Sequence, residues 1–193
     1  MQTRPVLGSV DALPLAPRRI LVAGVSGVGK STLSRCIAEL AGHPYTEIDA
    51  LYHGPNWVPR EEFLDDVEHF TRQPRWVTEW QYREARAVLL ERADTLVWLD
   101  LPVAVALGRV IRRTIRRRRT REVLWNGNSE GSLWRAFLAP EGIVRWAVGT
   151  RFKYRSSVPP LAAEHPHLQI VRLRSQCEVD AWVAGPLSAS TRH

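Results

Sequence analysis

The sequence predicts an α/β fold with a parallel sheet, and three observations lead to this class. Short apolar runs alternate with amphipathic helical patterns from Arg19 onward, as in successive βα units. A glycine-rich segment lies directly between the first such run and the first such helix. The chain has 193 residues, of which 45% are hydrophobic, enough for one substantial core and few for two. We therefore expect a single domain over residues 18–185, with flexible tails at 1–17 and 186–193.

The first half of the chain predicts three strands and three helices. Short runs of apolar and β-branched side chains, bounded by turn residues, predict strands at residues 19–24, 44–49 and 75–80. Apolar side chains that recur every three or four positions predict helices at residues 30–42, 59–73 and 82–93. Gly42 follows the last turn of the first helix and Pro59 opens the second, in positions that these residue types favour.

The second half continues the alternation around one break. Apolar runs predict strands at residues 94–102 and 167–175, and helical periodicity predicts helices at 103–119 and 176–185. A segment dense in glycine and asparagine ends the first of these helices, at residues 120–132. Two weaker helical stretches follow it, around 132–139 and 141–155.

The basic charge of the chain is concentrated in one segment. The formal net charge is +7, yet residues 105–155 alone hold thirteen Arg or Lys against three Glu. Such a segment suggests an anionic partner. A general preference for arginine is the alternative explanation, because Lys30 and Lys153 are the only lysines.

The remaining composition indicates a cytoplasmic protein without membrane segments. No run approaches the roughly 20 apolar residues that span a bilayer, and prolines interrupt the first seventeen residues, which lack the apolar core of a signal peptide. Cys36 and Cys177 fit no metal-binding spacing, so we expect two reduced thiols. The sequence does not indicate an oligomeric state.

The glycine-rich segment GVSGVGKST, residues 24–32, matches the phosphate-binding pattern GxxxxGK[ST] between an apolar strand and an amphipathic helix. Its glycines let the backbone wrap around an anion, and the following helix adds its positive end. Lys30 is expected to reach the β- and γ-phosphates of ATP, and the Ser31 hydroxyl to bind Mg²⁺. The predicted nucleotide-binding residues here are Gly24, Val25, Ser26, Gly27, Val28, Gly29, Lys30, Ser31 and Thr32.

Three carboxylates compete to complete the Mg²⁺ site. Asp100 ends a strongly apolar strand, but the Leu-Pro after it also suits a turn or helix cap. Glu79 ends the strand at 75–80, and Asp49 the strand at 44–49. The acid is expected on the strand beside the loop strand, which residue spacing alone does not identify.

These residues resemble the small P-loop kinases of the adenylate kinase and shikimate/gluconate kinase type, and among them the bacterial topology modulation proteins. The resemblance rests on GVSGVGKST, on LDLP followed by spaced arginines, and on the segments IDALYHGPNWVP (48–59), RWVTEWQY (75–82) and RLRSQCEVDAWV (172–183). Where related sequences more often read Asp-Gly-Asn-Tyr, this chain has Glu79 and Trp80 in the first two positions.

The resemblance implies a three-layer P-loop NTPase fold with a five-stranded parallel sheet in the order 2-3-1-4-5. That order places the third strand beside the loop strand and favours Glu79 as the metal ligand. It further implies an arginine-rich helical lid at about residues 112–135, with Arg109 over the adenine and Arg113 on phosphate. Arg174 and Ser175, after the last strand, are implied as contacts of the base.

The acceptor is expected beside the end of the second strand. The resemblance places a substrate-binding aspartate at Asp49, which could accept the acceptor's proton or hold its hydroxyl. The alternative is that Asp49 caps the following turn. Ligand-capable side chains gather after this strand and after the third one, and the predicted substrate contacts are Tyr52, His53, Asn56, Trp57, Trp80 and Tyr82.

Together these features predict a Mg²⁺- and ATP-dependent phosphotransferase that acts on a nucleotide or a hydroxylated metabolite. The expected catalytic residues are Lys30, Asp49, Arg113 and Arg117, with the arginines closing over the transferring group. The alternative is a regulatory or nucleic-acid-binding NTPase whose arginines follow a phosphate backbone. The arginine run lacks the interleaved aromatic residues of single-strand readers.

Overall fold

The computed structural model describes residues 5–120 and 154–191, and in the second half of the helix over 103–120 it describes only some of the side chains. Within this part, four strands form one parallel sheet in the order β2-β1-β3-β4. They are β1 (Arg19–Gly24), β2 (Trp76–Glu79), β3 (Thr95–Leu99) and β4 (Gln169–Leu173). The expected α/β class with a parallel sheet is confirmed. The lid expected at 112–135 is described only as far as Thr120, and the weaker helices expected at 132–139 and 141–155 lie almost entirely outside the described residues.

The expected five strands reduce to four in the described part of the chain, because the segment 44–49 does not form a strand. It touches the outer edge of β2 through one bridge, in which Val77 N–H donates to Pro44 O and Thr46 N–H donates to Val77 O, both at 2.9 Å. Beyond this bridge, side chains of β2 replace backbone pairing. The Thr78 hydroxyl donates to Thr46 O, and Ile48 N–H donates to the Glu79 carboxylate. The chain then turns into a helix, so the segment lies on the expected side of the sheet without extending it.

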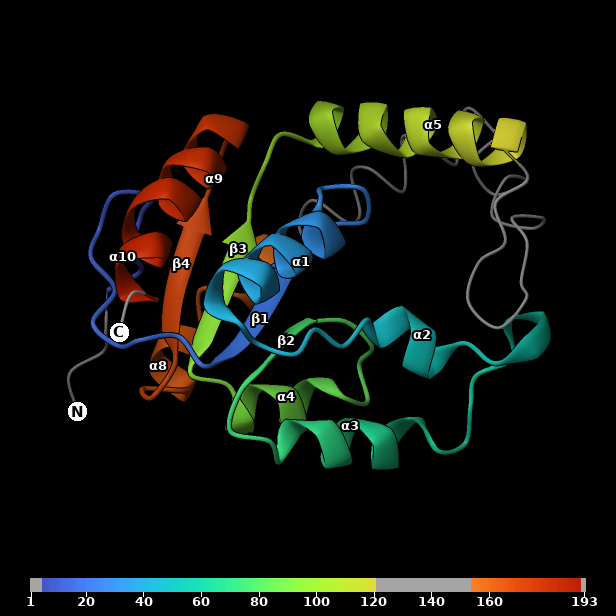
Figure 1. Ribbon diagram of the computed structural model, residues 1–193, viewed down its shortest axis with the longest axis horizontal. Coiled ribbons are helices and arrows are strands. Elements are labelled where there is room, and N and C mark those ends of the chain that lie inside the picture. Colours follow the sequence, from blue (N-terminus) through green and yellow to red (C-terminus); the bar gives the residue numbers. More distant parts are fainter. Residues whose placement is uncertain (1–4, 121–153, 192–193) are drawn as a thin grey trace.

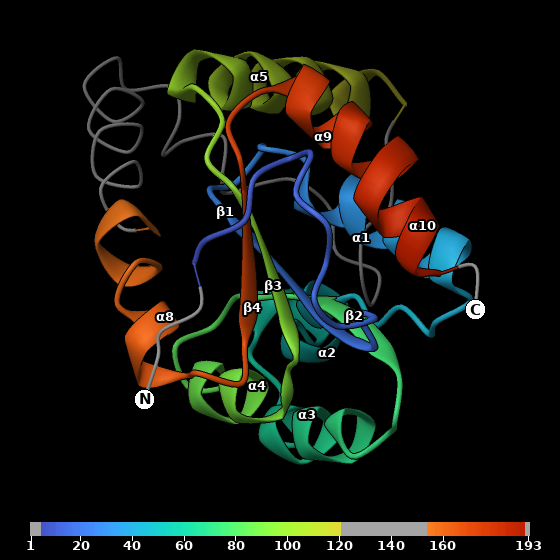
Figure 2. The ribbon, with the colours of Figure 1, turned by 90° about the vertical axis from the view of Figure 1, so that its left-hand side faces the viewer.

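Helices connect the strands and cover both faces of the sheet (Figures 1 and 2). The helix α1 (Lys30–Ala41) follows β1. The chain then reaches β2 through two helices and a 3₁₀ turn, which are α2 (Ile48–Tyr52), η1 (Pro55–Trp57) and α3 (Phe63–Thr71). The connection from β2 to β3 contains α4 (Arg86–Arg92), and the long α5 (Val103–Thr120) follows β3. After the undescribed stretch come α8 (Leu161–Glu164), β4, α9 (Gln176–Trp182), the π-turn η3 (Val183–Leu187) and α10 (Ser188–Ser190). The helix α5 crosses beyond the carboxyl ends of the strands (Figure 1).

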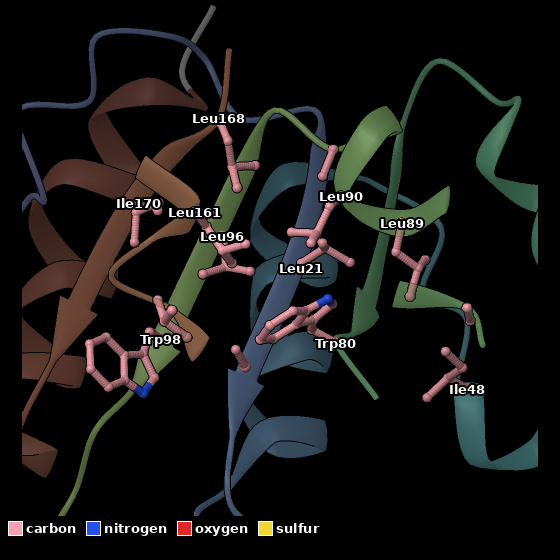
Figure 3. Packing of buried hydrophobic residues seen from close by; sticks show 14 of the residues in the cluster. Leu21, Ile48, Trp80, Leu89, Leu90, Leu96, Trp98, Leu161, Leu168 and Ile170 are labelled. Carbon is pink, nitrogen blue, oxygen red and sulfur yellow. The ribbon is translucent and has the colours of Figure 1, made fainter. Parts of the chain in front are cut away.

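Alternate strand residues feed two buried clusters, one on each face of the sheet. Ile20 and Val22 of β1 pack with α1 and α9, including Ile37 and Trp182. Leu21 of β1 belongs to the opposite cluster, in which the strands pack against α3, α4 and α8 (Figure 3). Strands covered on both faces have few polar side chains, which is why they are read easily as apolar runs.

The two terminal segments, for which the sequence predicted flexible tails, make specific contacts where they are described. Leu7 pairs with β4, since its N–H donates to Ile170 O and its carbonyl accepts from Arg172 N–H, both at 2.8 Å. At the other end, Leu187 is fully buried against the cluster that contains α1 and α9. These segments therefore cover the sheet beside β4 and α9.

Candidate active site

A cleft of about 940 Å³ lies at the carboxyl ends of the strands, where parallel sheets generally bind ligands. Four parts of the chain line it: the glycine-rich loop with the first turns of α1, the segment around α2, one face of α5, and one face of α9 with η3. The lining residues are Ser26, Gly27, Val28, Gly29, Lys30, Ser31, Thr32, Leu33, Cys36, Asp49, His53, Trp57, Gln81, Leu99, Arg109, Arg112, Arg113, Arg116, Gln176, Val179, Asp180, Val183 and Ala184.

The glycine-rich loop needs its glycines because α5 and β3 press against it. Gly24, Gly27 and Gly29 have φ values of 151°, 78° and 108°. A Cβ at Gly27 would lie 2.2 Å from Val110 Cγ2 and 2.7 Å from the Ala106 carbonyl oxygen. These contacts fix the curve of the loop, whose residues from Ser26 to Thr32 line the cleft. Gly24 and Val25, both predicted nucleotide contacts, lie behind this curve and do not line the cleft.

The first turn of α1 presents a positive end to the cleft. The helix begins at Lys30, its N-cap Gly29 offers no side-chain cap, and its first turn contains no acidic residue. The amides that a cap would satisfy are therefore left for an anion, and the helix dipole favours negative charge there. Lys30 is 8% exposed and its Nζ donates to Val25 O at 3.3 Å, so its ammonium lies along the loop.

Glu79 and Ser31, the predicted metal ligands, lie together beneath the loop. Glu79 ends β2 beside β1 and is 1% exposed. The Tyr45 hydroxyl donates to Glu79 Oε1 at 2.6 Å, and the Ser31 hydroxyl also bonds the carboxylate. Burial raises the pKa of Glu79, which the bonds from Tyr45, Ser31 and Ile48 N–H partly offset. No described cation forms an ion pair with Glu79, so this buried carboxylate suits a metal ion.

Asp100, the competing metal candidate, is held by two arginines instead. Its Oδ1 accepts from Arg155 Nε at 2.9 Å, and its Oδ2 accepts from the guanidinium of Arg172. The Asp100 side chain is only 9% exposed and does not line the cleft. The geometry therefore favours Glu79 for the metal. Asp100 lies between β3 and α5, and its two ion pairs link this point to β4 and to the chain before α8.

Four arginines of α5, at positions 109, 112, 113 and 116, line the cleft. Arg109 donates from Nη1 to Val28 O and from Nη2 to Gln176 Oε1, each at 2.6 Å, and so ties α5 to the loop and to α9. Arg112, Arg113 and Arg116 line the same cavity. The side chain of Arg117, predicted to be catalytic, lies outside the described part of the structure.

Asp49 is built into a network of side chains on the opposite wall. Its Oδ1 accepts from the Tyr82 hydroxyl at 2.6 Å and from Gln81 Nε2 at 3.0 Å. Since the Tyr82 hydroxyl gives its single hydrogen to Asp49, the His53 Nε2–H donates to the Tyr82 oxygen at 3.1 Å. Burial lowers the pKa of His53, although the charge of Asp49 opposes this. The hydrogen bonds described for the Asp49 carboxylate come from side chains rather than from the backbone of a turn, so the capping alternative is not supported.

Backbone strain is concentrated on this same wall. Asn56, Trp57 and Tyr82 have positive φ values of 58°, 62° and 52°, although none of them is glycine. Such strain often marks residues that a site holds in place. Trp57 lines the cleft beside His53, with ring centroids 5.1 Å apart. Asn56 is exposed and does not line it.

Three aromatic residues predicted as substrate contacts do not line the cleft. Trp80 is 3% exposed and belongs to the core, with the Arg86 guanidinium 4.5 Å from its ring centroid, so its prediction as a substrate contact was wrong. Tyr52 stacks on Tyr82 with centroids 3.8 Å apart, and neither ring lines the cleft. Both rings support Asp49 from behind.

The expected base contacts after β4 lie at the start of α9. The Ser175 hydroxyl accepts from Glu178 N–H and caps α9, and Arg174 is exposed with its N–H bonded to Glu178. Neither residue lines the cleft. The cleft is lined instead by residues further along α9 and η3, none of which was predicted from the sequence. They are Gln176, Val179, Asp180, Val183 and Ala184. Sequence reasoning also missed Gln81, Leu33, Cys36 and Leu99, and their only signal was position near the loop or a strand end.

The described residues contain neither a metal-binding cluster nor a membrane-spanning helix. No group of three or more His, Cys, Asp or Glu there is arranged to hold a metal ion, so the pair of Ser31 and Glu79 would need oxygen ligands from a nucleotide or water. No helix in the same residues is long and apolar enough to cross a membrane. Cys36 and Cys177 are both free thiols.

Comparisons of the fold identify small kinases. The chain superposes on a gluconokinase from Sinorhizobium meliloti 1021 with a TM-score of 0.53 and 22% identity, covering 92% of this chain and 93% of that one. A putative kinase from Chloroflexus aurantiacus gives a TM-score of 0.54 with 16% identity, covering 88% and 96%. A shikimate kinase from Bacteroides thetaiotaomicron gives 0.50 with 14% identity, covering 88% and 95%.

These likenesses show that the chain has the fold of small P-loop kinases, in agreement with the sequence motif. They give no support to the narrower resemblance to topology modulation proteins. No protein-family model matches the sequence, and no curated protein matches it either.

Proposed function

We propose that the protein is a kinase that transfers the γ-phosphoryl group of Mg²⁺·ATP to a hydroxyl group of a small acceptor. The observation that carries this proposal is that one cleft contains a phosphate-binding loop, a row of arginines and the carboxylate of Asp49. A phosphoryl donor and a group that accepts a proton are thereby brought to opposite walls of the same space.

The donor side suits a nucleotide with its metal ion. The loop amides, the first turn of α1 and Lys30 would hold the phosphates, and Ser31 with Glu79 would hold Mg²⁺. When bound, Mg²⁺ would neutralise part of the negative charge of the phosphates. Arg113 and Arg116 lie across the cleft from the loop's helix and would stabilise negative charge on the group in transit.

The acceptor side suits a hydroxyl better than a phosphate. Its described lining consists of Asp49, His53, Trp57 and Gln81, with no lysine or arginine from that wall. An acceptor phosphate close to the Asp49 carboxylate would be repelled by roughly 1 to 4 kcal/mol at 4 Å, depending on the dielectric. This argument favours a hydroxylated metabolite over a nucleoside monophosphate, the two acceptor classes that the sequence leaves open.

Asp49 would act through one defined oxygen. Gln81 and Tyr82 both donate to Oδ1, which leaves Oδ2 to receive the acceptor's proton. As the acceptor oxygen forms its bond to the γ-phosphorus, the bond from that phosphorus to the β–γ bridging oxygen breaks and ADP leaves. The hydroxyl proton passes to Asp49 Oδ2, so one proton and one phosphoryl group are transferred in balance.

The alternative of nucleic-acid binding gains no specific support. Arg109, Arg112, Arg113 and Arg116 all face the cleft of the loop, where a bound polyphosphate would meet them.

A coupled assay of ADP formation tests the proposal. Wild-type protein is given Mg²⁺·ATP and a panel of neutral polyols, hydroxy acids and nucleoside monophosphates. We expect turnover to be stimulated by a hydroxyl compound and to fall about 100-fold or more in Asp49→Asn, with ADP affinity unchanged. Asp65→Asn, which changes an exposed acid on α3 outside the cleft, is the control and should keep full activity. Normal ADP binding without stimulation by any acceptor would contradict the proposal.

A further inference from the structure

One face of α9 and η3 forms a wall of the cleft that the loop motif does not explain. Its residues are spaced three, one, three and one positions apart, so they lie on a single helical stripe. The polar member Gln176 bonds Arg109, and the apolar member Val179 packs in the same cluster as Leu33 of α1. The stripe consists of Gln176, Val179, Asp180, Val183 and Ala184.

A chain of hydrogen bonds fixes how the polar members are oriented. Arg109 carries only donors, so its Nη2 must face Gln176 Oε1, which it does at 2.6 Å. The amide nitrogen of Gln176 then points along the helix and donates to Asp180 Oδ1 at 2.8 Å. Because Arg109 is itself anchored to Val28 O of the loop, the amide cannot flip without losing both bonds.

This arrangement presents one donor beside one acceptor to the cleft. The amide nitrogen of Gln176 has two hydrogens, of which Asp180 takes one. The Asp180 carboxylate is acceptor-only when ionised, and its described bond to Gln176 uses Oδ1 alone. A ligand at this wall therefore meets a donor and an acceptor at adjacent positions, fixed in order along α9.

We propose that Gln176 and Asp180 read the Watson–Crick edge of the donor nucleotide and select adenine. Adenine offers an amino group at C6 next to an acceptor at N1, the complement of this pair. Inosine and guanine offer a carbonyl oxygen at C6 next to an N–H at N1, which would place an acceptor against Asp180 and a donor against Gln176. The selection rests on the proposed function, since it assumes a nucleotide whose phosphates lie on the loop.

The apolar members of the stripe support the same ligand class. Val179 and Leu33 are buried, and both line the cavity with Val183. Such surfaces accommodate the flat faces of a heterocycle, while the polar pair discriminates its edge. The site thus combines general affinity for a base with a side-chain test of its identity.

Binding of ADP, IDP and GDP in the presence of Mg²⁺, measured by calorimetry on the full chain, tests the selection without any turnover. We expect ADP to bind at least about tenfold more tightly than IDP or GDP. The 6-oxo bases of IDP and GDP would face Asp180 with an acceptor and Gln176 with a donor, so neither side chain could form its hydrogen bond. In Asp180→Asn the side chain gains an N–H₂ donor that suits a 6-oxo group. The ratio of the ADP and IDP dissociation constants should therefore fall to near one or reverse.

Glu39→Gln is the matched control, since it removes an exposed acid from α1 outside the cleft and should keep the wild-type ratio. Equal affinity of the wild type for all three nucleotides would overturn base reading and leave the proposed function intact. Absence of binding by any of them would overturn both. The wild-type ratios decide the question even where Asp180→Asn proves unstable.

Discussion

Replacing Gly27 by alanine should separate the loop from α5, and the structure sets the size of the effect. Two costs add up at this position. A residue with a Cβ pays about 1 kcal/mol or more for the φ of 78°. The new methyl group would also lie 2.2 Å from Val110 Cγ2 and 2.7 Å from Ala106 O, and the second contact is with helix backbone that cannot rotate away. Overpacking of this kind costs about 1 to 3 kcal/mol, so the total is about 2 to 4 kcal/mol.

Gly42→Ala is the control, because it imposes the first cost without the second. Gly42 has a φ of 63°, and a Cβ there would meet no atom within 4 Å. Urea titration of both variants should show Gly27→Ala to be less stable than Gly42→Ala by about 1 to 3 kcal/mol, with similar m-values. ADP affinity should also fall in Gly27→Ala alone, because α5 carries Arg109 and must shift. Equal stability of the two variants, within about 0.5 kcal/mol, would refute the steric argument.

Three further outcomes are expected. Asp100→Ala should lower the free energy of unfolding in urea by about 2 kcal/mol, because it unpairs Arg155 and Arg172, which are exposed enough to regain water. Glu79→Gln should weaken binding of Mn²⁺ in the presence of ADP by about tenfold or more, as read from the electron paramagnetic resonance of free Mn²⁺, and an unchanged affinity would remove Glu79 from the metal site. His53 has its pKa lowered below 6.5 by burial, so the unfolded chain takes up this proton first and the residue's contribution to stability is present above about pH 6.5 and lost as the pH falls. His53→Gln should therefore lose less stability than the wild type between about pH 7.5 and 5.5 in urea titrations, and a parallel loss in both would contradict the shift.

The α/β class follows from the sequence because β1, β3 and β4 are covered on both faces. Residues such as Leu21 and Val22 fall into opposite clusters, and both clusters exclude water, so the buried positions of β1 from Ile20 to Ala23 are all apolar. The segment 44–49 lies outside this rule. Its partner groups on β2 are a hydroxyl and a carboxylate, of Thr78 and Glu79, and side-chain bonds of this kind leave no pattern along the segment itself.

The loop side of the site can also be predicted, since a phosphate-binding loop is one continuous segment whose backbone does the binding. The wall formed by α9 and η3 cannot, because it depends on which face of a separate helix turns toward the cleft. Val179 and Trp182 mark the core face of α9, and nothing in that pattern says that Asp180 borders the cleft. Trp80 shows the converse error, since a residue just past a strand end was read as a ligand contact while it packs beneath Arg86.

The ion pairs of Asp100 give the chain between Leu101 and Tyr154 a common start and finish. One carboxylate at the end of β3 holds Arg172 of β4 and, through Arg155, the point where the chain returns to the described fold. Both ends of this stretch of chain are therefore held by the same carboxylate. For protein engineering, this marks Asp100 as a position to keep, because its loss would release both Arg172 of β4 and Arg155, where the described chain resumes.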